Sequence, residues 1–406
     1  MGSLTSKCCS KQQSAQTTKE REVFRFFMVG TGAAGKTTVV RQLKCLCKEK
    51  PKNYKAYDKD WNQIPIENIF SEEEMTQFRK IIRSNITTAV YNLIQQTAQW
   101  GHICAADKNA QKIVQIVEKA ELEESCTFNM NIQSSLGADL MEVLKDPNIA
   151  ETLRQHDKMS RKWHLEDGTL YFLCEEHIQR LFDDTSELTT TDIVHSRYPT
   201  TDVQDFRFSI SRMNIQIHDM GGQPTELMKM PEFINPWVAQ DREGYRNFVL
   251  FVTSMTDFNV PDEEEPTRTA MERSIKVLEL ILNEDAVQSC GLLIFFNKKD
   301  RFDDIVSTLQ RTEEGRSEIE KFLGDNMKKE AKTRLNTGNC PVGILGKALQ
   351  DKFDEVIRVK RKGANEKGVY MRFTQAVDSS IMADIFNIVK NQIIDNLISK
   401  GIFISV

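Results

Sequence analysis

The stretch GTGAAGKT at residues 30–37 follows the apolar run VFRFFMV at 23–29, and together they decide the fold of this chain. The stretch has the spacing G-x-x-x-x-G-K-S/T, and a helical pattern follows it to about Cys47. Glycines at this spacing let successive backbone N–H groups face phosphate oxygens, and the start of a helix adds partial positive charge. The sequence therefore predicts a phosphate-binding loop between a strand and a helix. The residues expected at the phosphates are Gly30, Thr31, Gly32, Ala33, Ala34, Gly35, Lys36, Thr37 and Thr38.

Two side chains of this loop indicate a nucleoside triphosphate with magnesium. The Lys36 ammonium is expected to reach the β- and γ-phosphates, and the Thr37 hydroxyl is expected to ligate Mg²⁺. The alternative is a glycine-rich turn that matches the pattern by chance, which the strand before it and the helix after it make improbable. The loop does not indicate which base is bound.

The base is indicated by Asn297-Lys298-Lys299-Asp300, which follows the apolar run at 291–296. A carboxylate such as that of Asp300 accepts two hydrogen bonds from the N1–H and the exocyclic amine of guanine, a pair of donors that adenine does not present. An exposed turn is the alternative for so short a motif. Its place after a strand and downstream of a phosphate-binding loop favours guanine.

A third motif, Asp219-Met220-Gly221-Gly222-Gln223, follows the alternating run at 213–218. Asp219 is expected to hold Mg²⁺ through water, and the Gly222 N–H to meet the γ-phosphate. Gln223 is expected to orient a water molecule for in-line attack. A plain β-turn is the alternative reading of this motif.

The chain alternates strand patterns with helical patterns, which predicts an α/β fold with a mainly parallel six-stranded sheet. Helical periodicity without strand patterns runs from Glu72 to about Leu181, which predicts an inserted all-helical domain. A long amphipathic helix is expected over 379–400. The expected strands are 23–29, 204–211, 213–218, 247–253, 291–296 and 368–373.

The composition is that of an ordinary globular protein. Of the 406 residues, 40% are hydrophobic and 28% are charged, which excludes collagen-like and disordered classes. No run reaches about 18 apolar residues, so a membrane-spanning helix is not expected. The net charge of −5 gives no basic footprint, and nucleic acid is therefore not an expected partner.

The N-terminus suggests a lipid anchor. The chain begins MGSLTS, which fits the N-myristoylation pattern with Gly2 as the acceptor. Cys8 and Cys9 follow closely and are candidates for palmitoylation, which would make the membrane attachment stable. The alternative is an unmodified, disordered terminus.

These motifs and the helical insertion resemble the heterotrimeric G-protein α-subunits, from about Phe24 to the C-terminus. The resemblance implies a Ras-like P-loop GTPase domain interrupted by a helical domain, with GTP or GDP and Mg²⁺ as ligands. It further implies a slow, regulated GTPase that couples a G protein-coupled receptor to an unidentified effector at the cytoplasmic face of the plasma membrane. A G-protein βγ dimer and a lipid-anchored membrane contact are the other implied partners. The implied segments are 1–22 (acylated), 23–50 (GTPase domain, first part), 51–192 (helical domain) and 193–406 (GTPase domain, second part, with the receptor-contacting helix).

The resemblance also assigns roles to individual residues. Arg197 matches the arginine that this family supplies in cis to the transferring phosphate, and Thr200 matches a switch threonine that ligates Mg²⁺. Asp167 matches a helical-domain residue that reaches across the nucleotide cleft, and Ala376 matches a backbone N–H that contacts the guanine oxygen. His195 lies in the same nucleotide-binding segment as Arg197. The implied catalytic residues are Lys36, Arg197 and Gln223.

The chain departs from the family pattern in the loops that surround the phosphates. The family usually has Glu and Ser at the positions of Ala33 and Ala34, and that Glu pairs with the catalytic arginine. Pro199 fixes a backbone torsion in the first switch segment, which is expected to be stiffer. The second switch carries apolar residues where the family has basic residues and Trp, so its βγ interface is either adapted or under relaxed constraint. Those residues are Pro224, Leu227, Met228 and Met230.

Two other functions fit parts of the sequence. The altered residues Ala33, Ala34, Pro199 and Pro224 would suit a nucleotide-binding adaptor with the same fold but slow or absent GTP turnover. A kinase or ATPase with a phosphate-binding loop is the third hypothesis. The guanine motif at 297–300 and the expected water-orienting glutamine speak against it.

Overall fold

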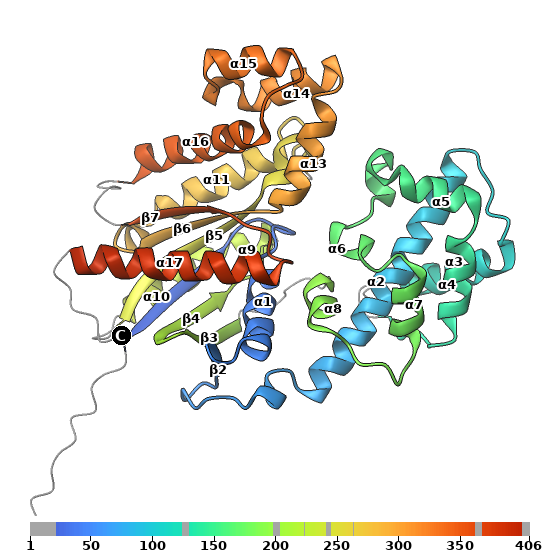
Figure 1. The fold of residues 1–406 in the computed structure, drawn as a ribbon, viewed down its shortest axis with the longest axis horizontal. Coiled ribbons are helices and arrows are strands. Elements are labelled where there is room, and N and C mark those ends of the chain that lie inside the picture. Colours follow the sequence, from blue (N-terminus) through green and yellow to red (C-terminus); the bar gives the residue numbers. More distant parts are fainter. Residues whose placement is uncertain are drawn as a thin grey trace, which may run out of the picture.

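The computed structural model describes residues 22–123, 130–197, 204–222, 224–240, 245–262, 264–361 and 368–399. It has two lobes, one built around a β-sheet and one made of helices (Figure 1). The helical lobe comes from one internal segment of the chain, and the sheet lobe contains the residues on both sides of it. The predicted α/β fold with an inserted helical domain is confirmed.

One seven-stranded sheet forms the centre of the sheet lobe, in the order β2-β3-β4-β1-β5-β6-β7. Strands β4, β1, β5, β6 and β7 pair in parallel, whereas β3 pairs antiparallel with both β2 and β4. The strands are β1 Val23–Val29, β2 Tyr54–Tyr57, β3 Gln204–Ile210, β4 Met213–Asp219, β5 Tyr245–Ser254, β6 Gly291–Asn297 and β7 Val369–Phe373.

The sheet has one strand more than the six predicted. The additional strand β2 pairs with β3, with Tyr54 opposite Ile210. Tyr54 is buried, and its hydroxyl donates to the carbonyl of Ala383 at 3.1 Å. The strand therefore packs in the sheet lobe, although it falls within the interval 51–192 that the sequence assigns to the helical domain.

Helices cover both faces of the sheet, and each face has its own apolar core. β1 is buried along its whole length, so its side chains alternate between the two cores. One core lies against α1 (Lys36–Glu49) and α17 (Ser379–Ser399), and the other lies against the helices between β4 and β7. Those helices are α9 Pro224–Leu227, α10 Met230–Ala239, α11 Ala270–Leu282, α12 Asp285–Gln288, α13 Lys299–Leu309, α14 Glu313–Leu323, α15 Lys329–Asn336 and α16 Val342–Lys360.

The helical lobe is organised around α2 (Glu72–Gln99). Ser71 begins this helix with a capping box, because its hydroxyl accepts from the Glu74 N–H and Glu74 accepts from the Ser71 N–H. A third apolar core, from Ile82 to Leu188, joins α2 to the shorter helices of the lobe. These are α3 Asp107–Leu122, α4 Leu136–Leu144, α5 Pro147–Arg154, α6 Asp167–Leu170 and α7 Glu175–Phe182. The next helix, α8 (Thr190–His195), buries Ile193 and Val194 in the sheet-lobe core that contains α1.

Single turns of 3₁₀ helix connect several elements: η1 Ile66–Asn68, η3 His156–Lys158, η4 Arg161–Trp163, η5 Met255–Asn259 and η6 Gly324–Asn326. Among the described residues, no helix is both long and apolar enough to cross a membrane.

Candidate nucleotide-binding site

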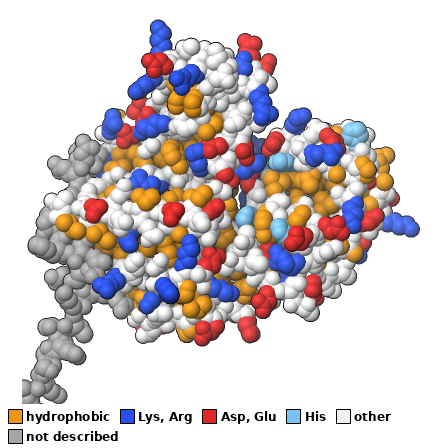
Figure 2. Space-filling model, in the orientation of Figure 1, with side chains coloured by type: hydrophobic (Ala, Val, Ile, Leu, Met, Phe, Trp, Pro, Cys, Tyr) orange, Lys and Arg blue, Asp and Glu red, His pale blue; other side chains and the backbone are white. Residues whose placement is uncertain are grey.

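Side chains of both lobes line one cavity of about 260 Å³. Positive and negative side chains gather where the two lobes meet (Figure 2). The cavity is formed by the start of α1, the end of α8, the segment around α6 and the loops after β6 and β7. The predicted site residues that line it are Gly32, Ala33, Gly35, Lys36, Thr37, Thr38, Asp167, His195, Arg197, Gly222, Asn297, Lys298, Asp300 and Ala376.

The phosphate-binding loop is tightly packed against its neighbours. Gly30 has φ +149°, and a Cβ there would lie 2.0 Å from the carbonyl oxygen of Val252. Gly35 has φ +96°, and its Cβ would lie 2.2 Å from Nδ2 of Asn297. Only glycine fits at these two positions, which explains the glycines that open and close the loop. The residue before α1 is Gly35, which has no side chain to cap the helix, and the start of the helix lines the cavity, where an anion is favoured.

Lys36 is buried at the base of this loop. Its ammonium donates to the carbonyl oxygens of Gly30 at 2.8 Å and Thr31 at 2.9 Å. Burial lowers the pKa of Lys36 to about 8, and the carboxylates of Asp219 and Glu226 act in the opposite direction. An anion beside Lys36 would therefore favour its charged form, as a phosphate group does.

Thr37 and Asp219 form an oxygen-rich pair that fits a magnesium ion. The Thr37 hydroxyl donates to Oδ2 of Asp219 at 3.1 Å. Burial raises the pKa of Asp219 to about 6, and Lys36 acts against this rise. Within the described part of the chain, the buried Oδ1 of Asp219 has no hydrogen-bond partner. A carboxylate and a hydroxyl are suitable oxygen ligands for Mg²⁺ or for its bound water.

Asn297 ties the phosphate-binding loop to the loop after β7. Its Nδ2 donates to the carbonyl of Ala34 at 3.0 Å. Its Oδ1 accepts from the N–H of Ala376 at 2.9 Å and from the hydroxyl of Thr374 at 3.2 Å. The first residue of the guanine motif thus has a connecting role. The Ala376 N–H, implied to contact the base, is directed at Asn297 in this structure.

Asp300 and Lys298 place opposite charges at the same end of the cavity. Asp300 lies in the first turn of α13, and burial raises the pKa of its carboxyl above the ordinary value. Lys298 has φ +59°, and its ammonium forms an ion pair with Oδ2 of Asp167 at 3.3 Å. Asp167 therefore reaches from the helical lobe to the sheet lobe, as the family resemblance implies.

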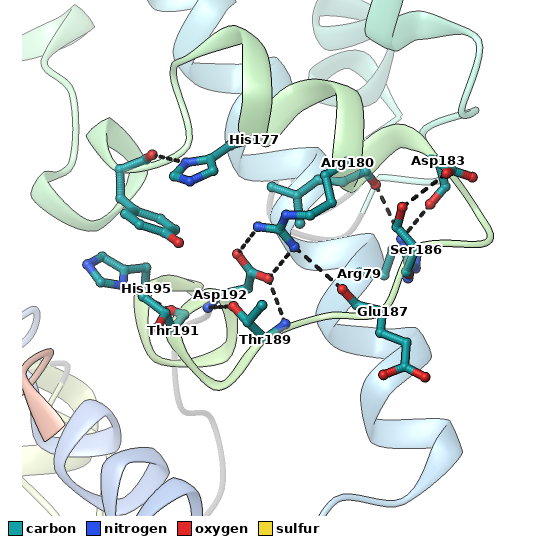
Figure 3. A network of polar contacts seen from close by, with 12 residues as sticks. Arg79, His177, Arg180, Asp183, Ser186, Glu187, Thr189, Thr191, Asp192 and His195 are labelled. Atoms are coloured by element: carbon teal, nitrogen blue, oxygen red, sulfur yellow. Dashed lines mark hydrogen bonds and ion pairs between the residues drawn. The ribbon is translucent and has the colours of Figure 1, made fainter. Parts of the chain in front are cut away.

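A polar network anchors α8, the helix that leads to Arg197 (Figure 3). The buried carboxylate of Asp192 accepts from both terminal nitrogens of Arg180 at 2.7 Å. Asp192 also forms a capping box with Thr189 at the start of α8. Burial would raise the pKa of Asp192, but its hydrogen bonds hold it below the ordinary value. This anchored helix brings His195 and the following arginine to the cavity wall.

His195 lies in the cavity wall with its ring stacked on Tyr171, at 4.2 Å between ring centroids. Its Nδ1 contacts the carbonyl of Thr191 at 2.9 Å. Burial lowers the pKa of His195, which favours the neutral ring near pH 7. These contacts account for its packing role beside the nucleotide-binding segment.

Arg197 is held through its backbone and its side chain. Its N–H donates to Oδ1 of Asn85 at 2.9 Å, and its carbonyl accepts from Nδ2 of Asn85 at 3.1 Å. Its guanidinium forms an ion pair with Glu166 of the helical lobe. On the other side, Arg41 of α1 donates to the carbonyl of Ser196. Contacts from both lobes therefore hold the segment that carries the arginine.

Sequence reasoning missed three charged residues of the cavity: Glu166, Arg41 and Arg301. Arg301 contacts Asp167 at 3.2 Å and Asp157 at 3.4 Å, which adds a second cation to the connection between the lobes. Burial would raise the pKa of Asp167, but Lys298 and Arg301 together lower it. Their place in the sequence was the one signal that could have found two of them: Glu166 directly precedes Asp167, and Arg301 directly follows the guanine motif.

The remaining predicted residues are placed as follows. Four of them lie directly behind the cavity lining, each in a hydrogen bond with Lys36, Asn297 or Thr37: Gly30, Thr31, Ala34 and Asp219. The predictions that lie outside the described residues concern Gln223, Thr200, Gly2, Cys8 and Cys9.

The chain matches a family profile described as G-protein alpha subunit over residues 3–393. It is 22% identical to the guanine nucleotide-binding protein alpha-3 subunit of Neurospora crassa, over 94% of this chain and 91% of the relative. It is also 22% identical to the alpha-17 subunit of Caenorhabditis elegans, over 99% and 95% of the two chains. The G(s) subunit alpha of Homarus americanus is 23% identical over 93% and 90%. The match covers both lobes and the cavity between them, and the chain belongs to the G-protein alpha subunit family.

Proposed function

We propose that this chain is a guanine nucleotide-binding alpha subunit that binds and hydrolyses GTP in the cavity between its lobes and acts as a signalling switch. One observation carries the proposal: the phosphate-binding loop, the guanine motif and Arg197 meet in a single cavity. Each of these elements has a separate chemical task, and efficient hydrolysis of GTP uses all three together.

The described residues divide the work of phosphoryl transfer. Lys36 exchanges its loop carbonyls for the β- and γ-phosphate oxygens, and Arg197 neutralises the charge that develops on the transferring phosphate. Thr37, Thr200 and, through water, Asp219 would hold Mg²⁺, which neutralises phosphate charge when bound. Gln223 orients the attacking water. Asp300 accepts the two guanine donors and sets base specificity.

The switch is proposed to lie in the segments around Thr200 and Gly222. A γ-phosphate holds both segments, and hydrolysis releases them, which changes the surface offered to an effector. In the second switch, Met230, the first residue of α10, packs in the core of the sheet lobe, whereas the Met228 side chain is 82% exposed. We therefore expect an altered βγ contact that depends on an apolar Met228 surface.

Attachment to a receptor and to the membrane is proposed to follow the family pattern. The helix predicted to contact a receptor is present as α17, and its exposed face includes Ile381 and Ile388. Myristoylation at Gly2 and palmitoylation at Cys8 or Cys9 would place the chain at the cytoplasmic face of the plasma membrane. Metabolic labelling with myristate and palmitate analogues, in wild type and Gly2→Ala, tests this anchor.

A competition experiment tests the nucleotide assignment. A fluorescent GTP analogue is bound to the full chain with Mg²⁺ and displaced by GTP, GDP or ATP. Displacement by both guanine nucleotides, with ATP much weaker, supports the proposal. Equal displacement by ATP would favour the kinase or ATPase hypothesis.

The adaptor hypothesis is kept because one structural observation favours it. Trp237 at the end of α10 is buried, and the Arg25 guanidinium lies 4.3 Å from its ring centroid and donates to its carbonyl at 3.0 Å. This contact anchors the second switch region to β1, and an anchored switch region suits an adaptor with slow or absent GTP turnover. Nucleotide binding without phosphate release in a single-turnover assay would identify an adaptor.

Gly222→Ala is expected to weaken GTP binding about tenfold, since overpacking of this kind costs about 1–3 kcal/mol. An added Cβ would lie 2.1 Å from Nζ of Lys36 and 2.7 Å from the carbonyl oxygen of Gly30. The substitution must therefore displace Lys36 or the start of the second switch. Gly343→Ala is the control, because its Cβ would meet no described atom within 4 Å outside its chain neighbours and its own helix backbone. Equal GTP affinity in the two variants would contradict this packing.

Arg301→Leu is expected to accelerate GDP release about two- to fivefold, the effect of losing partly exposed ion pairs. The substitution removes the contacts of α13 with Asp157 and Asp167, so the lobes separate more easily. Release of a fluorescent GDP analogue measures the rate. Arg358→Leu, which removes an ion pair on the exposed side of α16, is the control. A release rate equal to that of the control would show that Arg301 does not help to close the cavity.

A further inference from the structure

We propose that Glu166 positions the guanidinium of Arg197 for GTP hydrolysis. The inference rests on the proposed function and names a residue that neither the sequence motifs nor the family match assigns. The phosphate-binding loop offers no carboxylate for this purpose, because its residues at the relevant positions are Ala33 and Ala34. In this chain the carboxylate comes instead from the helical lobe.

The two side chains meet at the cavity wall. Nη1 of Arg197 pairs with Oε1 of Glu166, and both residues line the cavity. The Arg197 side chain is 34% exposed and that of Glu166 is 27% exposed, so both remain within reach of a bound nucleotide. A guanidinium has five N–H donors, and pairing with one carboxylate leaves others for phosphate oxygens. The pair can therefore orient the arginine without consuming it.

Both partners extend from fixed backbone. Asn85 binds the N–H and the carbonyl of Arg197, so the arginine is anchored to α2. The carbonyl of Glu166 accepts from the N–H of Thr169 at 2.9 Å, where α6 begins. With both backbones held, the ion pair restricts the rotamers of the arginine side chain, which is what a positioning contact must do.

Glu166 also links the arginine to the contact between the lobes. The next residue, Asp167, pairs with Lys298 and Arg301 of the sheet lobe. The dipeptide Glu166-Asp167 thus contacts the arginine with one carboxylate and the guanine-motif side with the other. The contact between the lobes thus helps to fix the residue that pairs with Arg197.

If the pair served only to stabilise the fold, loss of the Glu166 carboxylate would lower the melting temperature. Ion pairs that water reaches contribute little to folding, so loss of the Glu166 carboxylate should leave thermal stability unchanged. Nε2 of His164 also lies 3.0 Å from Oε1 of Glu166, and this contact does not involve Arg197. The test must therefore separate an effect that acts through Arg197 from one that does not.

A double-mutant cycle makes this separation. Single-turnover GTP hydrolysis is measured for wild type, Glu166→Gln, Arg197→Cys and the double variant. Glu166→Gln is expected to slow hydrolysis about five- to tenfold with unchanged GTP affinity and melting temperature. In the Arg197→Cys background, Glu166→Gln should have no further effect. Glu175→Gln, which removes an exposed ion pair with Lys145 in the same lobe, is the control.

Equal loss in both backgrounds, or no loss in either, would overturn the proposal. A second readout does not depend on hydrolysis: the side-chain Nε resonance of Arg197 in protein labelled with ¹⁵N-arginine, assigned by its absence in Arg197→Cys. Glu166→Gln should move this resonance toward the position of solvent-exposed arginines, and Glu175→Gln should not. An unmoved resonance would overturn the positioning role, and this readout remains valid if wild type binds GTP without hydrolysing it. Binding without hydrolysis would separately refute the proposed GTPase function.

Discussion

Arg197→Cys is expected to slow single-turnover GTP hydrolysis about 10³-fold while leaving GTP affinity within a few fold of wild type. The range established for cis or trans arginines in such GTPases is about 10³–10⁵, and we expect its lower end because Arg197 is partly exposed. The guanidinium acts on charge that develops only in the transition state, so its loss should lower the rate and spare binding. Radiolabelled phosphate release measures the rate, and equilibrium displacement of a fluorescent analogue measures affinity.

The matched control for this variant is Arg358→Cys, on the exposed side of α16. It should hydrolyse GTP at the wild-type rate. If Arg197→Cys also keeps the wild-type rate, the arginine is not the cis catalytic residue, whatever its place in the cavity.

Asp300→Asn is expected to weaken GTP binding about 10²–10⁴-fold, since it removes two hydrogen bonds to a charged acceptor at about 1.5–3 kcal/mol each. An amide can instead donate to the carbonyl that xanthine carries in place of the guanine amine. The variant should therefore bind xanthosine triphosphate better than GTP. Competition between the two triphosphates for a fluorescent analogue measures the reversal.

Asp304→Asn is the control for the base-specificity prediction. Asp304 lies four residues further along α13 and its side chain is exposed. This variant should keep the wild-type preference for GTP. An unchanged preference in Asp300→Asn would show that Asp300 does not read the base.

Three of the six strands that sequence reasoning found have long apolar runs, and β3, β4 and β7 were found from shorter or alternating patterns. β1, β5 and β6 are buried on both faces, so hydrophobic residues follow one another without interruption. β2 was missed because it has only four residues, of which Tyr54 and Ala56 are buried. Its strand conformation depends on pairing with β3, which lies about 150 residues further along the chain and leaves no local signal.

The site shows the same division between local and long-range information. The phosphate-binding loop and the guanine motif are contiguous, so their residues could be named before their positions in space were known. Glu166 and Arg301 could not be named, because their roles come from partners in the opposite lobe or in the segment that joins the lobes. A charged residue beside a motif is usually solvated, and only the fold shows that these two have partners.

The altered second switch distinguishes this chain from the pattern its family resemblance implies. Leu227 and Met230 pack against the core of the sheet lobe, and Trp237 extends that contact. Apolar residues have thus replaced basic ones partly to anchor the helix itself. Packing in the core therefore explains the apolar residue at Met230. The exposed Met228 side chain remains as the apolar group that a partner can contact.

The central claim is that the chain hydrolyses the GTP it binds, and single-turnover hydrolysis by the wild-type full chain tests it most directly. Protein is loaded with γ-labelled GTP, free nucleotide is removed, and Mg²⁺ starts the reaction. The account predicts one phosphate released for each GTP bound, with GDP left in the cavity. Labelled GTP that stays bound and intact, while Arg197→Cys behaves identically, would contradict it and favour the adaptor.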